Sequence, residues 1–250
     1  RIIQIVPLLK RDWYGFRKHF VSYLALWVII PILIHLILAI PLSRFIILEV
    51  RYLNWSAAGI WITSAAMASF LETALRIRKI NYETPSIDAI LQSPISNLEM
   101  LIGLVLRGVV FGFVQFIFSI SITCTLNHEY LGALSILMII IQIIGIILFF
   151  SVLGTFIGLL ISHPIIFIQF SLALFVIITL GMGSFIPISS YPESYVTIIN
   201  NIPLITVLQN IQSIIIHQTI QWTSFFLTFI LTILLFFITL IISNKTLRNI

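Results

Sequence analysis

Residues 84–96, TPSIDAILQSPIS, form a short polar stretch with the sequence pattern of a helix, between two long apolar runs. The whole chain is 60% hydrophobic and only 8% charged, which is too few charges to cover a water-soluble protein. Lipid is therefore expected to surround most of the chain. We expect residues 84–96 to lie outside the bilayer as a docking element that a soluble partner protein grips, which suggests transport driven by that partner.

Six apolar runs are long enough to cross a hydrocarbon layer of about 30 Å, which needs roughly 20 residues per helix. These runs are residues 19–40, 55–75, 97–126, 131–162, 164–185 and 222–243. We find no internal repeat and no linker between them. The sequence therefore predicts an all-α polytopic membrane protein with six transmembrane helices and a single domain over residues 1–250.

Lysine and arginine are concentrated before the first run, after the second and after the sixth. The residues in these three groups are Arg1, Lys10, Arg11, Arg17 and Lys18; Arg76, Arg78 and Lys79; and Lys245 and Arg248. By the positive-inside rule, both termini and the loop after the second span are expected in the cytoplasm. The net charge of +5 is thus attributed to topology rather than to nucleic-acid binding, and the inner (cytoplasmic) membrane is the predicted location.

Residues 1–18 have apolar positions every three or four residues, as in an amphipathic helix. Two interpretations are open: an interface helix in the headgroup plane, or a simple membrane anchor. The chain begins at Arg1, so we expect an initiator residue or a short leader before it. Four basic residues between 10 and 18 interrupt any apolar core of a cleavable signal.

The polar loop itself has helix start and stop signals. Thr84 can cap a helix whose first position is Pro85, and Pro94 ends it. Ser96 and Glu99 then have the spacing of a capping box that starts the third span. A helix of two turns is marginal alone, so we expect it to pack on a partner; the alternative is a surface helix packed on lipid headgroups.

Residues 186–220 are mostly apolar but contain several prolines. They are too long for a turn and too apolar for a solvated loop. We expect short re-entrant helices on the outer side, packed on protein or lining a cavity.

Ionisable residues within the spans are few. Glu72 lies one turn before Arg76, which suggests an ion pair between them, and Arg107 lies two turns into the third span. Arg107 either faces a cavity or partner or extends toward the cytoplasmic surface. The GxxxG pairs 108–112 and 154–158 are expected to serve packing within the chain ahead of a dimer contact. The histidines and Cys124 suggest no metal site, and we find no catalytic constellation.

Four segments resemble a known family. Residues 70–76 (FLETALR) and 87–101 (IDAILQSPISNLEML), with Gly103, resemble the exit of the second span, the coupling helix and the entry of the third span in type-2 ABC exporter permeases. Residues 183–192 (GSFIPISSYP) are similar to the outer motif of that family. Residues 202–204 (IPL) are similar to its Asn-Pro-Leu element, with Ile202 in place of the usual Asn. The loop is most similar to nodulation-factor and drug exporter permeases.

The resemblance implies a permease subunit without catalysis of its own, and we find no phosphate-binding G-x-x-x-x-G-K-[ST] loop in the sequence. ATP and magnesium would be bound by two copies of an ABC-type ATPase subunit, beneath a homodimer of this chain. The substrate would be an amphiphile: a lipid-linked oligo- or polysaccharide, a lipid or a hydrophobic drug. A secondary transporter and a heme-type exporter permease are the alternatives.

The resemblance also assigns site residues. The ATPase-docking residues of the coupling helix would be Ser86, Ile87, Asp88, Ile90, Leu91, Ser93 and Pro94. The residues of an outer gate would be Phe185, Pro187, Ile188, Pro192 and Pro203.

Overall fold

The computed structural model describes residues 16–48, 50–83, 96–128, 131–217, 219 and 221–248. Within these ranges all regular structure is helical. Six helices are long and apolar enough to cross a membrane, namely Phe20–Leu42, Tyr52–Arg78, Asn97–Asn127, Ala133–Leu160, Pro164–Gly181 and Trp222–Lys245. The predicted all-α, six-span architecture is confirmed, with boundaries shifted by a few residues. The second, third and sixth helices extend beyond the apolar runs, whereas the fourth and fifth are shorter than predicted.

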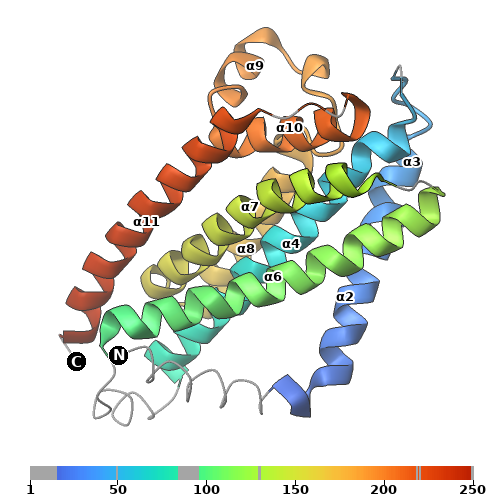
Figure 1. The fold of residues 1–250 in the computed structure, drawn as a ribbon. Helices are drawn as coiled ribbons and strands as arrows, with labels where there is room; N and C mark the ends of the chain where they lie inside the picture. The colour runs from blue at the N-terminus through green and yellow to red at the C-terminus, as the bar shows by residue number, and fades with distance from the viewer. Residues whose placement is uncertain are drawn as a thin grey trace.

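The helices follow the chain in this order: α2 (Phe20–Ile34), η2 (His35–Ala39), α3 (Ile40–Leu42), α4 (Tyr52–Arg78), η3 (Lys79–Glu83), α6 (Asn97–Asn127), α7 (Ala133–Leu160), α8 (Pro164–Val176), η4 (Ile177–Gly181), η5 (Ile188–Ser190), α9 (Glu193–Ile199), α10 (Pro203–His217) and α11 (Trp222–Arg248). We call the end of the bundle where α4 finishes and α6 begins the basic end, because Arg76, Arg78 and Lys79 lie there. The opposite end carries α9 and α10 (Figure 1).

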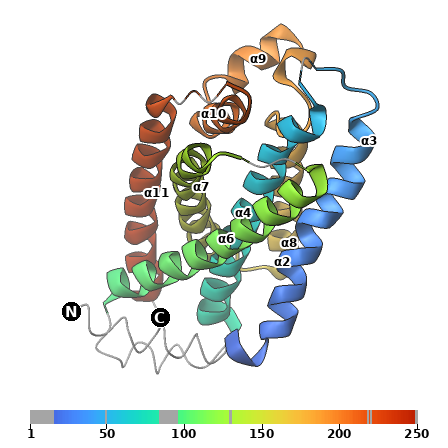
Figure 2. The same cartoon turned by 45° about the vertical axis from the view of Figure 1, so that its right-hand side comes forward.

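Helix α4 is the centre of the bundle. It packs mainly against α6 and α7, with α2 beyond α6 and α11 beyond α7 (Figure 2). In the most apolar stretch of α4, 78% of the residues are buried, compared with 17% in that of α11. The many serine and alanine residues of α4, together with Gly59, explain this position, because small side chains let helices approach closely in a membrane.

The glycine pairs pack within the chain, as the sequence predicted. A Cβ atom at Gly112 would lie 3.1 Å from the Ala65 carbonyl oxygen, and one at Gly158 would lie 2.7 Å from that of Ala74. Both contacts are to the backbone of α4. These glycines therefore hold α6 and α7 close to the central helix.

The predicted capping box at the start of α6 is confirmed. The Ser96 hydroxyl accepts a hydrogen bond from the Glu99 backbone N–H (3.3 Å), and the Glu99 carboxylate accepts one from the Ser96 N–H (2.8 Å). Two of the free N–H groups at the helix start are satisfied in this way. This explains why a carboxylate is tolerated at the beginning of a membrane-spanning helix.

Prolines divide the segment between α8 and α11 into short helices, as predicted. Helix α9 begins directly after Pro192, α10 begins at Pro203, and the two form an angle of 94°. Helix α10 crosses the end of the bundle above α7 and α4 (Figure 1). One face of α10 is buried, through Ile205, Leu208, Ile211 and others, so this segment is packed on protein.

Candidate functional site

Only some of the sites predicted from the sequence lie within the residues that the structure describes. The docking residues from Ser86 to Pro94, and residues 1–15 of the expected interface helix, lie outside the described residues. Residues 16–18, at the end of that expected helix, are helical. The gate residues, Glu72 and Arg107 are all described. The described parts of these sites are therefore the two helices that flank the docking loop and the segment at the opposite end.

Glu72 and Arg107 form an ion pair at membrane depth. The Arg107 Nε atom donates a hydrogen bond to Glu72 Oε1 at 2.6 Å, and a second guanidinium nitrogen contacts the same oxygen. The side chains are 11% and 14% exposed for Arg107 and Glu72, respectively. Arg107 follows the start of α6 by ten residues, which is about 15 Å along the helix. The sequence suggested Arg76 as the partner of Glu72; the structure gives it Arg107, on the neighbouring span.

Aromatic rings of α2 and α6 cover this pair. The Arg107 guanidinium lies 5.3 Å from the Phe111 ring centroid, within cation–π range. The Phe111 ring lies 5.1 Å from that of Tyr23, which belongs to α2. Three spans thus meet at this ion pair. The Arg107 side chain faces Glu72 on the neighbouring span and does not extend to the cytoplasmic surface.

We expect Glu72→Gln and Arg107→Gln each to lower the free energy of unfolding by on the order of 3 kcal/mol, because each leaves one charge unpaired in a low-dielectric site. The double variant should recover most of this loss. The measurement is unfolding by SDS in mixed micelles, with Glu193→Gln, on the exposed α9, as the control. A double variant as unstable as the worse single variant would contradict the pairing.

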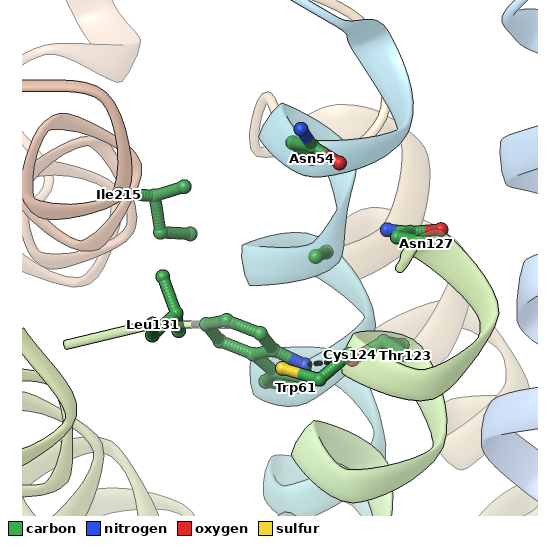
Figure 3. A pocket seen from close by; sticks show the side chains of 8 residues that line it. Asn54, Trp61, Thr123, Cys124, Asn127, Leu131 and Ile215 are labelled. Carbon is green, nitrogen blue, oxygen red and sulfur yellow. Dashed lines mark hydrogen bonds between the residues drawn. The ribbon is translucent and has the colours of Figure 1, made fainter. Parts of the chain in front are cut away.

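A second polar feature runs along the contact between α4 and α6 toward the opposite end. The Ser64 and Ser119 hydroxyls lie 2.7 Å apart, and the Trp61 indole N–H donates to the Thr123 hydroxyl at 2.6 Å. Figure 3 shows Asn54 and Asn127 beyond them, around a small cavity that is also lined by Cys124 and Ile215. We call this row the polar seam; its residues are Asn54, Trp61, Ser64, Gln115, Ser119, Thr123 and Asn127.

The polar seam was not predicted from the sequence, although a signal was present. Gln115, Ser119, Thr123 and Asn127 recur every four residues, a spacing that places them on one face of a helix. All four are buried, at 3% exposure or less. At membrane depth, such a face indicates a helix contact held by hydrogen bonds.

The segment that carries the predicted gate residues, from Phe185 to Pro203 (the gate segment), is fixed to α4 at its start. The Tyr52 hydroxyl donates a hydrogen bond to the Phe185 carbonyl oxygen at 2.7 Å. The backbone of Ser184 lies so close to Gly59 that a Cβ atom there would lie 2.9 Å from the Ser184 carbonyl carbon. Gly183 has a φ angle of +78°, which L residues rarely adopt. The chain therefore turns sharply where it meets the N-terminal part of α4.

The predicted gate residues differ in their exposure. Phe185 is fully buried in the hydrophobic core, and Pro187 is also buried. Ile188 and Pro203 are partly exposed, while Pro192 is exposed. The buried Phe185 side chain therefore fixes the position of the segment, whereas the 188–192 turn lies at the protein surface.

Tyr191 ties this turn back to the end of the fifth span. Its hydroxyl donates to the Leu180 carbonyl oxygen. Burial, with a smaller contribution from Tyr195, raises the pKa of Tyr191 above its ordinary value. The hydroxyl therefore stays protonated, and able to donate, throughout the physiological pH range.

At the basic end, Arg78 lies in the interior. It is 3% exposed, and its guanidinium donates to the carbonyl oxygens of Ile161 (3.0 Å), Ser162 (3.1 Å) and His163 (3.4 Å). These carbonyls follow the end of α7, where a helix leaves carbonyl groups without intrahelical partners. From the sequence, Arg78 was used only to predict which side of the membrane is cytoplasmic, and these contacts were not predicted.

The two histidines at the spans differ in burial. His35 is buried on η2, whereas His163, which precedes the first residue of α8, is exposed. Within the residues that the structure describes, no three His, Cys, Asp or Glu side chains come together in a group that could hold a metal ion.

Together, these features define a class: a polytopic helical membrane protein with a polar loop at its basic end and a bent helix pair at the opposite end. A model of the ABC-2 type transporter family matches residues 3–216. The chain therefore belongs to the ABC-2 type transporter membrane family, and it is the transmembrane subunit of such a transporter, which works with an ABC-type ATPase subunit. No curated protein matches the chain significantly.

Proposed function

We propose that this chain is the permease of an ATP-driven exporter that moves an amphiphilic molecule out of the cytoplasm. It works as a homodimer in the inner membrane, with two copies of the ATPase subunit. The arrangement of the two bundle ends carries this proposal: α4 and α6 flank the docking loop at one end, and the bent pair α9–α10 covers the other.

The basic end is the cytoplasmic one in this proposal, with both termini on that side. Arg76, Arg78 and Lys79 end the second span there, and Lys245 ends the sixth. Positive charge of this kind marks cytoplasmic loops. The docking residues between Ser86 and Pro94 then face the ATPase.

The segment from Phe185 to α10 is the outer gate. Its backbone is anchored to α4 by Tyr52, while the 188–192 turn is more exposed. A buried anchor and an exposed tip suit an element that moves as a rigid body between closed and open states. In the resting state, the exposed parts of two copies close the path between them.

Charge distribution supports an amphiphilic substrate. The spans Phe20–Leu42, Ala133–Leu160 and Pro164–Gly181 contain no Asp, Glu, Lys or Arg. Glu72 and Arg107, both at membrane depth, neutralise each other. An apolar path of this type suits a lipid, a lipid-linked glycan or a hydrophobic drug better than a small ion. Family membership favours ATP-driven transport over a secondary transporter.

The proposal is tested by purifying the tagged chain from its native membrane. We expect an ATP-hydrolysing subunit to copurify, hydrolysis to be absent from the separated permease, and mass spectrometry to detect a bound amphiphile. In vesicles that contain the complex, ATP should drive transport of that molecule. Transport by the permease alone, driven by a proton gradient, would instead support a secondary transporter.

A further inference from the structure

Helix α8 contacts α4, and the chain is joined to α4 just before α8 and again after η4. At the basic end, Arg78 binds the three carbonyls of the turn that leads into α8. Its guanidinium also lies 4.7 Å from the ring centroid of Phe167, in the first turn of α8. Phe167 stacks in turn on Phe70 of α4, with the rings inclined by only 8°.

At the opposite end, the Tyr52 hydroxyl binds the Phe185 carbonyl, and the Ser184 backbone contacts Gly59. Between the two joints, most of α8 is exposed: Phe167 and Ser171 are its buried residues. The segment η4, which follows α8, has π-helical bonding. π-helical turns are irregular and frequently occur at functional sites. The stretch from α8 to Phe185 is thus joined to α4 at its two ends, while most of α8 between them is exposed.

Helix α4 also leads directly to the docking loop. It continues through η3 to Glu83, one residue before Thr84. Tyr82 in η3 donates a hydrogen bond to the Leu159 carbonyl at the end of α7 (2.8 Å). Ile77 and Ile80 pack there with Leu159, Met100 and Leu104. At the N-terminal end of the docking loop, a displacement therefore acts on the stretch of α4 and η3 that contains Arg78.

We propose that Arg78 is a positioning residue that transmits motion of the docking loop to α8, and that Tyr52 passes the motion of this helix and α4 to the gate segment. This inference rests on the proposed function, because it requires an ATPase at residues 84–96. Three carbonyls held by one planar guanidinium form a joint that moves with α4. A lysine ammonium is a compact point charge without the planar array of N–H donors of a guanidinium. Arg78→Lys therefore retains the charge but cannot hold the three carbonyls together.

The test uses the complex of the chain with its ATPase subunit, in lipid vesicles and in a Cys124→Ser background. A fluorophore on Gln169→Cys, an exposed position of α8, reports the movement of this helix when ATP is added. We expect Arg78→Lys to reduce the ATP-induced fluorescence change at least five-fold, while ATP hydrolysis stays within two-fold. Lys79→Arg, the reciprocal exchange at the next and exposed residue, should leave both unchanged.

A second variant separates the two joints. With a fluorophore on Ser190→Cys, in the exposed turn of the gate segment, Tyr52→Phe should abolish the ATP response while the response at Gln169→Cys persists.

Phe167→Leu keeps an apolar side chain but removes the ring under the guanidinium, and it replaces Arg78→Lys if that variant does not fold.

The outcomes are distinct. If no ATPase subunit binds or hydrolyses ATP with the wild-type chain, the proposed function fails. If the wild-type complex hydrolyses ATP but α8 gives no response, or if Arg78→Lys responds like wild type, the inference alone is overturned. It is also overturned if hydrolysis and response fall together in proportion to the amount of folded complex, because Arg78 would then be only structural.

Discussion

Replacing both Gly154 and Gly158 by alanine is expected to lower the free energy of unfolding by about 3 kcal/mol or more, since added methyl groups in a packed interface cost about 1–3 kcal/mol each. A Cβ atom at Gly158 would lie 2.7 Å from the Ala74 carbonyl oxygen. At Gly154 the contact is with the Phe70 carbonyl and the Thr73 side chain. Backbone atoms of a central helix cannot turn aside as a flexible side chain can, so α7 must separate from α4.

Gly103→Ala is the matched control. Gly103 also lies within a helix, but a Cβ atom there has no atom within 4 Å apart from its chain neighbours and the backbone of its own helix. Alanine has a higher helix propensity than glycine by about 1 kcal/mol, so this variant should be as stable as wild type or more stable. Unfolding by SDS, followed by circular dichroism, measures both. If the double variant unfolds like wild type but changes its association state, the pair belongs to a dimer contact instead.

Much of the fold could be predicted because the bilayer imposes it on each helix separately. An apolar run of about 20 residues must be helical in lipid, and local signals such as Ser96 and Glu99 determine where a helix starts. The breaks at Pro192 and Pro203 are equally local, because proline lacks the N–H that a continuous helix needs. Each of these features is determined by residues close to one another in the sequence, so it can be predicted without knowing the three-dimensional packing.

The contacts between helices could be predicted only in part. Lipid is as apolar as most side chains, so hydropathy does not show which helices touch. Glu72 has a nearby cation in the sequence, Arg76, yet the structure pairs it with Arg107, thirty-five residues away. Arg78 likewise binds carbonyls more than eighty residues further along the chain. Partners of this kind depend on the packing of whole spans.

The second large effect is expected at the docking loop. Ile87, Ile90 and Leu91 share one face of the helix predicted from the sequence. If this face fills an apolar cleft on the ATPase subunit, Ile90→Asp places a carboxylate in that cleft, and burying an unpaired charge is very costly. We expect the amount of ATPase that copurifies with the permease to fall at least ten-fold, and ATP-driven transport to be abolished.

Gln92→Asp is the control, since it introduces the same charge on the opposite face of the predicted helix, where a polar side chain already stands. Both variants should insert and fold like wild type, because a loop outside the bilayer contributes little to the packing of the spans. Size-exclusion chromatography and SDS unfolding check this. Normal recruitment of the ATPase by the Ile90→Asp variant would show that residues 84–96 pack on lipid headgroups, and a different surface at the basic end would then have to bind the ATPase.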